Sequence, residues 1–162
     1  MWVRLMNWMI ADGEPPLPNV GSLLTCVGLR VRGEVTAAPP DSPDGSVETQ
    51  GGHPPEVMYR LTGRAGEPRD FDVDTGQAGM RHAGVEFVLT VGFDRYQVQT
   101  DGWASDVPTG SRVTVTGSLA VVGEYEWDAF ALSELRADWL VKAVAPADND
   151  DTMLDLLAPS NG

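Results

Sequence analysis

Apolar and polar residues alternate along most of this chain with a period of two. In residues 26–35, valines and leucines recur at every second position, while Arg30 and Arg32 fall on the opposite face. The same pattern recurs in residues 57–61 and on either side of Gly117. A period of two is typical of strands that have one buried face and one exposed face. We therefore expect a mainly β protein.

The clearest local prediction is a hairpin, in which residues 85–91 and 95–100 flank a Gly-Phe-Asp connection. Residues 130–144 also show near-helical spacing, but we favour a strand over about 138–145, because the segment ends in a proline. Together these strands predict a small antiparallel β-barrel of about five or six strands. Such a barrel would be similar to the oligonucleotide/oligosaccharide-binding (OB) type.

Two segments fall outside the alternating pattern. Residues 37–55 are rich in proline, glycine and aspartate, so we expect a mobile loop within a single domain that spans residues 1–145. From residue 146 to residue 162 the chain becomes an acidic tail. Thr152 and Asp155 have the spacing of a helix cap, which predicts a short amphipathic helix over residues 152–158 or, failing that, a disordered segment.

Among the features of the composition, the net charge bears most directly on the possible binding partners. The 162 residues include 24 acidic and 11 basic ones, for a formal net charge of −13 at pH 7. Such a charge repels phosphate backbones and anionic membrane surfaces at long range. No stretch approaches the roughly 20 apolar residues that a membrane helix needs. The one cysteine, Cys26, excludes an intrachain disulfide and lies in an apolar run, so we expect a buried thiol and a cytoplasmic protein.

A short motif lies near the N-terminus. Trp8 is followed by Gly-Glu-Pro at residues 13–15, and Val20-Gly21 then leads into an alternating segment. This arrangement resembles a family of uncharacterised actinomycete proteins, whose members begin with a strand, a tryptophan, a Gly-Glu-Pro-like turn and a Val-Gly-Asp strand start. The paired cysteines usual in that family are replaced here by Ala11 and Asp12. The family has no known activity, so the resemblance implies no function.

Three aspartates, at positions 70, 72 and 74, form the most suggestive polar spacing. On a strand, Asp70, Asp72 and Asp74 share one face, and three carboxylates on one face are candidate ligands for Ca²⁺ or Mg²⁺. The helical calcium-binding loop requires glycine and glutamate where Thr75 and Arg81 stand. We therefore interpret the aspartates as the solvated face of an edge strand, and we expect no metal and no cofactor.

The chain shows no recognisable catalytic motif. Its two histidines, His53 and His82, lie in the Pro/Gly-rich segment and before a strand, without a nucleophile at a known spacing. Glycine-rich phosphate loops and metalloprotease motifs are missing from the sequence. We expect a non-enzymatic protein, and an enzyme whose site assembles from distant residues remains the third alternative.

Two features favour a protein partner. Tyr125 and Trp127 stand among acidic residues, which suits a basic protein surface better than a nucleic acid; the alternative is that Trp127 is a core residue beside a solvated acidic loop. The tail carries an apolar stripe that needs a surface to fold against, which is a partner's groove, this protein's own barrel or, if the tail is disordered, none; the hypothesis that we pursue is the partner's groove. The stripe consists of Met153, Leu154, Leu156 and Leu157. The leading hypothesis is an accessory module that acts through protein–protein contact.

The second alternative is an OB-type barrel that binds single-stranded nucleic acid. Such a site needs a positive groove for the backbone and aromatic side chains for the bases. A local arginine patch on the acidic protein would supply the positive charge, and its candidates are Arg30, Arg32, Arg60 and Arg64.

Overall fold

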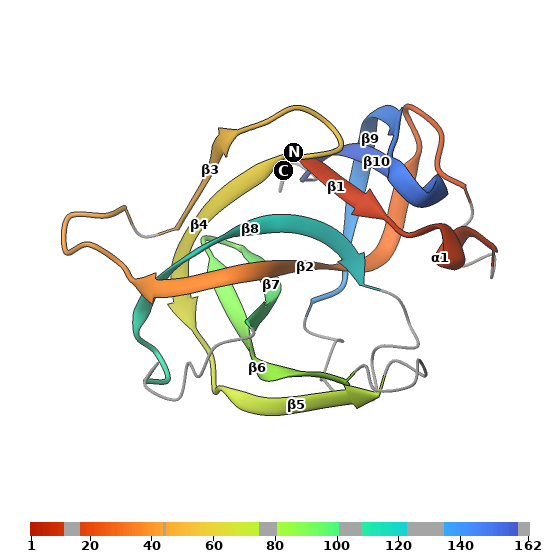
Figure 1. Ribbon diagram of the computed structural model, residues 1–162. Helices are drawn as coiled ribbons and strands as arrows, with labels where there is room; N and C mark the ends of the chain where they lie inside the picture. The colour runs from red at the N-terminus through yellow and green to blue at the C-terminus, as the bar shows by residue number, and fades with distance from the viewer. Residues whose placement is uncertain (12–16, 44, 75–80, 101–107, 123–134, 159–162) are drawn as a thin grey trace.

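The computed structural model describes residues 1–11, 17–43, 45–74, 81–100, 108–122 and 135–158, and these residues are mainly β (Figure 1). Within these ranges, ten strands form a single sheet, with one short α-helix and one 3-10 turn. The elements are β1 (Trp2–Leu5), α1 (Asn7–Ala11), β2 (Leu23–Ala37), β3 (Ser46–Gly51), β4 (Met58–Ala65), β5 (Arg69–Asp74), β6 (Arg81–Val91), β7 (Asp94–Thr100), β8 (Arg112–Val122), β9 (Ala137–Pro146), η3 (Asp148–Asp150) and β10 (Thr152–Leu157).

The strand pairings close into two circuits that share β2 and β8. In the first circuit, β2 pairs with β8, β8 with β4, β4 with β6, β6 with β7, and β7 again with β2. The second circuit runs from β8 through β1, β10 and β9 back to β2. Each circuit has one parallel pair, β2–β7 in the first and β1–β8 in the second. β3 and β5 lie at the two ends of the sheet, beyond β4 and β6.

Two glycines face each other in the shared pair β2–β8. Gly33 stands opposite Gly117, and ten consecutive residue pairs join the two strands around this point. A Cβ atom on Gly33 would lie 1.9 Å from the Thr116 carbonyl oxygen, and one on Gly117 would lie 2.2 Å from the Arg32 carbonyl oxygen. Only glycine allows the two backbones to approach so closely at this point.

One hydrophobic core serves both circuits. Its cluster of buried residues includes Val31, Leu61 and Val98 from the first circuit and Val3 and Leu154 from the second. The strands alternate inward and outward residues, so the polar residues between these positions face outward. The largest fully buried side chains are Trp139, Tyr96 and Phe87.

The two strand predictions for the second half of the chain are confirmed. β6 and β7 form the antiparallel hairpin expected over residues 85–100, with Val91 opposite Asp94 at its tip. The ambiguous segment after residue 130 contributes β9, a strand over Ala137–Pro146. The expected mobile loop over residues 37–55 is wrong in part, because Ser46–Gly51 forms β3, which pairs with β4.

The predicted tail is wrong. Residues 152–157 form β10, which lies between β1 and β9, so the domain does not end at residue 145 and no helix forms over 152–158. Met153, Leu154 and Leu156 are buried in the common core or at its edge, and only Leu157 is exposed, at 48%. A helix does not form despite the cap-like spacing, because pairing of β10 with β1 and β9 satisfies its backbone N–H and C=O groups. The same pairing buries Met153, Leu154 and Leu156.

An arginine fastens the β9–β10 connection to β1. Arg4 forms ion pairs with Asp148 at 2.9 Å and with Asp151 at 3.0 Å. The hydrogen bond from Arg4 lowers the pKa of Asp148 below its ordinary value, and the positive charge of Arg4 acts in the same direction. The Asn7 backbone N–H also donates to Asp151. The acidic residues at the start of the predicted tail are thus tied to the first strand.

The expectation of a buried Cys26 thiol is also wrong. Cys26 is exposed and has a φ of 55°, at an irregularity where the register of β2 against β9 shifts between Leu24 and Val27. The Cys26 backbone N–H donates to Asp138 of β9 at 2.8 Å. The irregularity turns this residue out of the alternating pattern on which the expectation depended.

Candidate functional site

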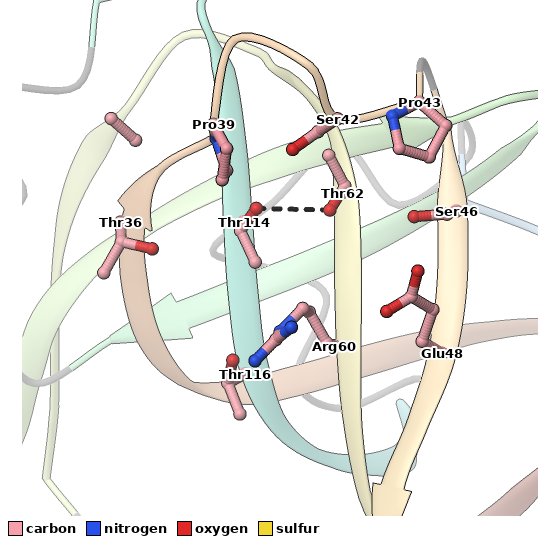
Figure 2. A pocket seen from close by; sticks show the side chains of 11 residues that line it. Thr36, Pro39, Ser42, Pro43, Ser46, Glu48, Arg60, Thr62, Thr114 and Thr116 are labelled. Atoms are coloured by element: carbon pink, nitrogen blue, oxygen red, sulfur yellow. Dashed lines mark hydrogen bonds between the residues drawn. The ribbon is translucent and has the colours of Figure 1, made fainter.

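A polar cleft of about 350 Å³ lies on the outer face of β2, β8, β4 and β3 (Figure 2). The segment that follows β2 forms its rim through Pro39, Ser42 and Pro43. This volume falls within the range of ordinary small-ligand sites, although most such sites are more apolar. The remaining lining residues are Thr36, Ala37, Ser46, Glu48, Arg60, Thr62, Thr114 and Thr116.

Strand register creates the floor of the cleft. Thr114 of β8 stands opposite Thr36 of β2 and Thr62 of β4, and Thr62 stands opposite Ser46 of β3. We call these four residues the hydroxyl row. Thr62 and Thr114 share a buried hydrogen bond of 3.2 Å between their hydroxyl oxygens. Thr62 and Thr114 alternate with residues of the core, namely Leu61, Val113 and Val115, so they lie on the outer side of β4 and β8.

A second row of side chains on the same face lies two residues further along each strand. Thr116 of β8 stands opposite Glu34 of β2 and Arg60 of β4, and Arg60 stands opposite Glu48 of β3. We call these four residues the charged row. Arg60 and Glu48 make no hydrogen bond or ion pair with the described residues, although they are cross-strand neighbours. Both side chains border the cleft in Figure 2. The cleft therefore offers a guanidinium, a carboxylate and several hydroxyls to a ligand.

The rim of the cleft is held in place by β8. The Arg112 guanidinium donates a hydrogen bond to the Ser42 carbonyl oxygen, and the Ala38 backbone N–H donates to the Arg112 carbonyl oxygen at 3.1 Å. Ser42 itself closes a turn, because its N–H donates to the Pro39 carbonyl oxygen at 3.0 Å. The rim is therefore a fixed wall of the site.

A buried polar network lies on the outer face of the first circuit, along β2, β7, β6 and β5. Arg32 donates to Gln99 at 3.0 Å, and Gln99 donates to Glu86 at 3.2 Å. Arg69 donates to the other carboxylate oxygen of Glu86 at 3.2 Å, and Gln97 donates to Glu86 at 3.0 Å. Glu86 is only 1% exposed, so four strands are tied together through one buried carboxylate.

Sequence reasoning missed this network, although a signal was present. Glu86 in β6 lies between Val85 and Phe87, and Gln97 and Gln99 in β7 flank Val98. In the register of the predicted hairpin, Glu86 stands opposite Gln99. Three amide and carboxylate groups close together on one face of a hairpin indicate mutual hydrogen bonding, because buried polar groups need partners.

The four candidate nucleic-acid arginines share the outer face, but they are engaged differently. Arg30 is buried, and Arg32 belongs to the Glu86 network. Arg64 donates to the Gly110 carbonyl oxygen at 3.4 Å, and Arg60 borders the cleft. The face therefore holds the predicted charges, whereas the aromatic side chains of the neighbouring strands, such as Tyr59 and Tyr96, are buried.

The other candidate residues do not assemble into a site. The backbone of Asp70, Asp72 and Asp74 lies in β5, at one end of the sheet, and the side chains of the last two are outside the described residues. Among the residues that the structure describes, no group of three potential ligands is placed to hold a metal ion. Tyr125 and Trp127 also lie outside the described residues.

Comparisons with known proteins add no family to these observations. No family model matches the chain, and neither a curated protein nor a solved structure matches it. The described residues also include no helix of the length and apolar character needed to cross a membrane.

Proposed function

We propose that this protein is a non-enzymatic binding module built on a small barrel of the OB type. The first circuit of pairings, from β2 through β8, β4, β6 and β7, would be the barrel, and the second circuit would extend it on one side. The strand pairings support this assignment, because these five strands pair in succession and the last one pairs again with the first. Such barrels commonly bind ligands on an outer strand face and its adjoining loops, which is where the polar cleft lies.

The ligand of this module is an extended protein segment that adds a strand beside β3. The observation that carries the proposal is the exposure of β3, because five of its six residues are exposed. β3 ends the sheet, and no described strand pairs with its outer edge. An exposed edge of this kind offers unpaired backbone N–H and C=O groups to an incoming strand.

The charged row favours a basic segment. Along this row, Glu34, Thr116, Arg60 and Glu48 present negative, neutral, positive and negative side chains in turn. Glu48 stands at the open end, so a lysine or arginine on an added strand would continue the alternation of charge. The net charge of −13 acts in the same direction, because it attracts basic partners at long range.

A designed peptide tests this function. The probe alternates valine and lysine over about seven residues, the length of an ordinary strand. We expect it to bind and to protect the amide protons of β3 from hydrogen exchange, because the added strand pairs with them. Glu48→Lys should weaken binding about tenfold, since a cross-strand attraction becomes a repulsion.

The matched control is Glu67→Lys, which makes the same charge change at an exposed position outside β3. It should weaken binding much less than Glu48→Lys. A peptide that alternates valine and glutamate should not bind. Equal affinities for the two lysine variants, or binding without protection of β3, would show that the β3 edge is not the site.

Binding of single-stranded nucleic acid is the second candidate, favoured by the common outer face of Arg30, Arg32, Arg60 and Arg64. Under this alternative, a labelled oligodeoxynucleotide would bind at low salt and dissociate as salt increases. Arg60→Gln would weaken that binding, while Glu48→Lys would strengthen it. The opposite responses to Glu48→Lys separate the two functions.

We place the protein in the cytoplasm as part of the same proposal. The exposed thiol of Cys26 has no second cysteine with which to pair. Reducing compartments preserve exposed thiols of this kind, whereas oxidising ones favour disulfides between molecules.

A further inference from the structure

A row of three leucines lies across the outer face of the second circuit. Leu140 of β9 stands opposite Leu23 of β2 on one side and opposite Leu157 of β10 on the other. Leu23 is 58% exposed and Leu157 is 48% exposed. Leu140 is partly exposed and alternates with the buried residues Trp139 and Val141, so it lies on the outer face. We call these three residues the leucine row, and because cross-strand neighbours on one face contact each other, the row is a continuous apolar strip.

Opposite charges flank the leucine row along β9. Asp138 lies two residues before Leu140 and Lys142 lies two residues after it, and both are exposed on the same outer face. Asp138 accepts a hydrogen bond from the Cys26 backbone N–H at 2.8 Å, and Lys142 lies 3.5 Å from Asp155. A carboxylate accepts several hydrogen bonds and an ammonium donates three, so each group can still take a further partner. The row is therefore bounded by a negative charge at one end and a positive charge at the other.

This arrangement of charges is complementary to itself in one orientation. Two aligned sheets that pack face to face keep their strands within about 30° of each other, so a second β9 over this one runs either parallel or antiparallel to it. The parallel orientation would set Lys142 over the Lys142 of the second copy. The antiparallel orientation, centred on Leu140, sets Lys142 over the Asp138 of the second copy and the reverse. The same two-fold axis brings the two leucine rows together.

We propose that the leucine row is the contact surface of a homodimer, in which β9 packs antiparallel to the β9 of a second copy. Each dimer then holds two pairs of Lys142 and Asp138 beside the apolar contact. The net charge of −13 on each chain opposes association at long range, so the dimer is weak and forms best where salt screens that repulsion. The surface does not include β3, which lies at the end of the sheet, so it is independent of the function proposed for that edge.

Sedimentation equilibrium of the full chain at physiological salt measures this association. We expect the average mass to rise from that of one chain toward that of two as the protein concentration increases from micromolar to millimolar. Leu157→Ser should raise the dissociation constant at least about tenfold, because each dimer loses two apolar side chains from its interface. Val47→Ser is the matched control and should leave the dissociation constant unchanged, since Val47 is an exposed apolar residue of β3, outside the leucine row.

An exchange of charges tests the orientation of the two copies. Lys142→Asp alone and Asp138→Lys alone should each weaken the dimer about tenfold, because like charges then face each other across the interface. The double variant with both substitutions should recover most of the affinity, because opposite charges face each other again. Within one chain the two positions lie about 13 Å apart along β9, so this recovery requires a second copy.

Three results would overturn the proposal. A chain that stays monomeric up to millimolar concentration would mean that another molecule, and not a second copy, covers the leucine row. Equal dissociation constants for Leu157→Ser and Val47→Ser would place any dimer contact elsewhere. A double variant that dimerises no better than the two single charge variants would exclude the antiparallel packing of β9.

Discussion

At the scale of single residues, Glu86 is the common acceptor of the buried polar network. It accepts hydrogen bonds from Arg69, Gln97 and Gln99 while it is itself almost fully buried. A buried carboxylate is tolerated only when donors replace the water that it loses. In this protein the donors come from two neighbouring strands, so the carboxylate also fixes their lateral alignment.

Replacing Glu86 by alanine should lower the free energy of unfolding by about 2–4 kcal/mol, because it leaves the buried amides of Gln97 and Gln99 without their acceptor. Urea denaturation measures the change. Glu67→Ala, at an exposed position, should cost less than about 0.5 kcal/mol. A Glu86→Ala variant as stable as the wild type would mean that the network contributes no net stability.

At the scale of elements, β10 is the strand whose role differs most from its local sequence. Leu154 is completely buried between β1 and β9, while Leu157 in the same strand is half-exposed. Leu154→Ala should therefore lower the free energy of unfolding by about 2–5 kcal/mol, the cost of a cavity in a packed core. Leu157→Ala should cost below about 1 kcal/mol, and both are measured by urea denaturation. Similar losses for the two variants would contradict the placement of β10.

The ion pairs between β1 and the β9–β10 connection should make stability depend on acidity. Arg4 holds the pKa of Asp148 below its ordinary value of 3.8, so its stabilisation is present above that value and is lost as pH falls through the lower, folded value. Arg4→Gln removes this contribution. The difference in stability between wild type and Arg4→Gln should shrink as pH falls from neutral to below that folded pKa.

Urea denaturation at a series of pH values measures this convergence. Arg60→Gln is the control, because Arg60 makes no ion pair with the described residues, and its effect should not vary with pH. A difference between wild type and Arg4→Gln that stays constant down to acid pH would exclude the ion pairs as its cause.

At the scale of the whole molecule, periodicity predicted the mainly β character, the β6–β7 hairpin and β9, but the described residues form ten strands where five or six were expected. It failed where pairing partners lie far apart in the chain. β10 is stabilised by β1, about 150 residues away, and no local pattern carries that information. The cleft depends on the register among β2, β8, β4 and β3, which alternation within one strand cannot give.

The two circuits should unfold together, because they share β2, β8 and one core. We expect a single thermal transition in which the calorimetric and van't Hoff enthalpies agree. Circular dichroism and tryptophan fluorescence should report the same midpoint. Two separate transitions would mean that the second circuit is an independent unit attached to the first.

The close approach of β2 and β8 at Gly33 and Gly117 also has a consequence for mutational tolerance. Both strands belong to both circuits, and at Gly33 and Gly117 there is no room for even a methyl group. In a library of random single variants selected for folding, substitutions at these two glycines and at the buried positions of β2 and β8 should be rare. They should be common along β3, which has one strand partner and mostly exposed side chains. Amino-acid substitutions should therefore accumulate faster in β3, the proposed binding edge, than in β2 and β8. The binding partner can then change during evolution while the rest of the fold stays the same.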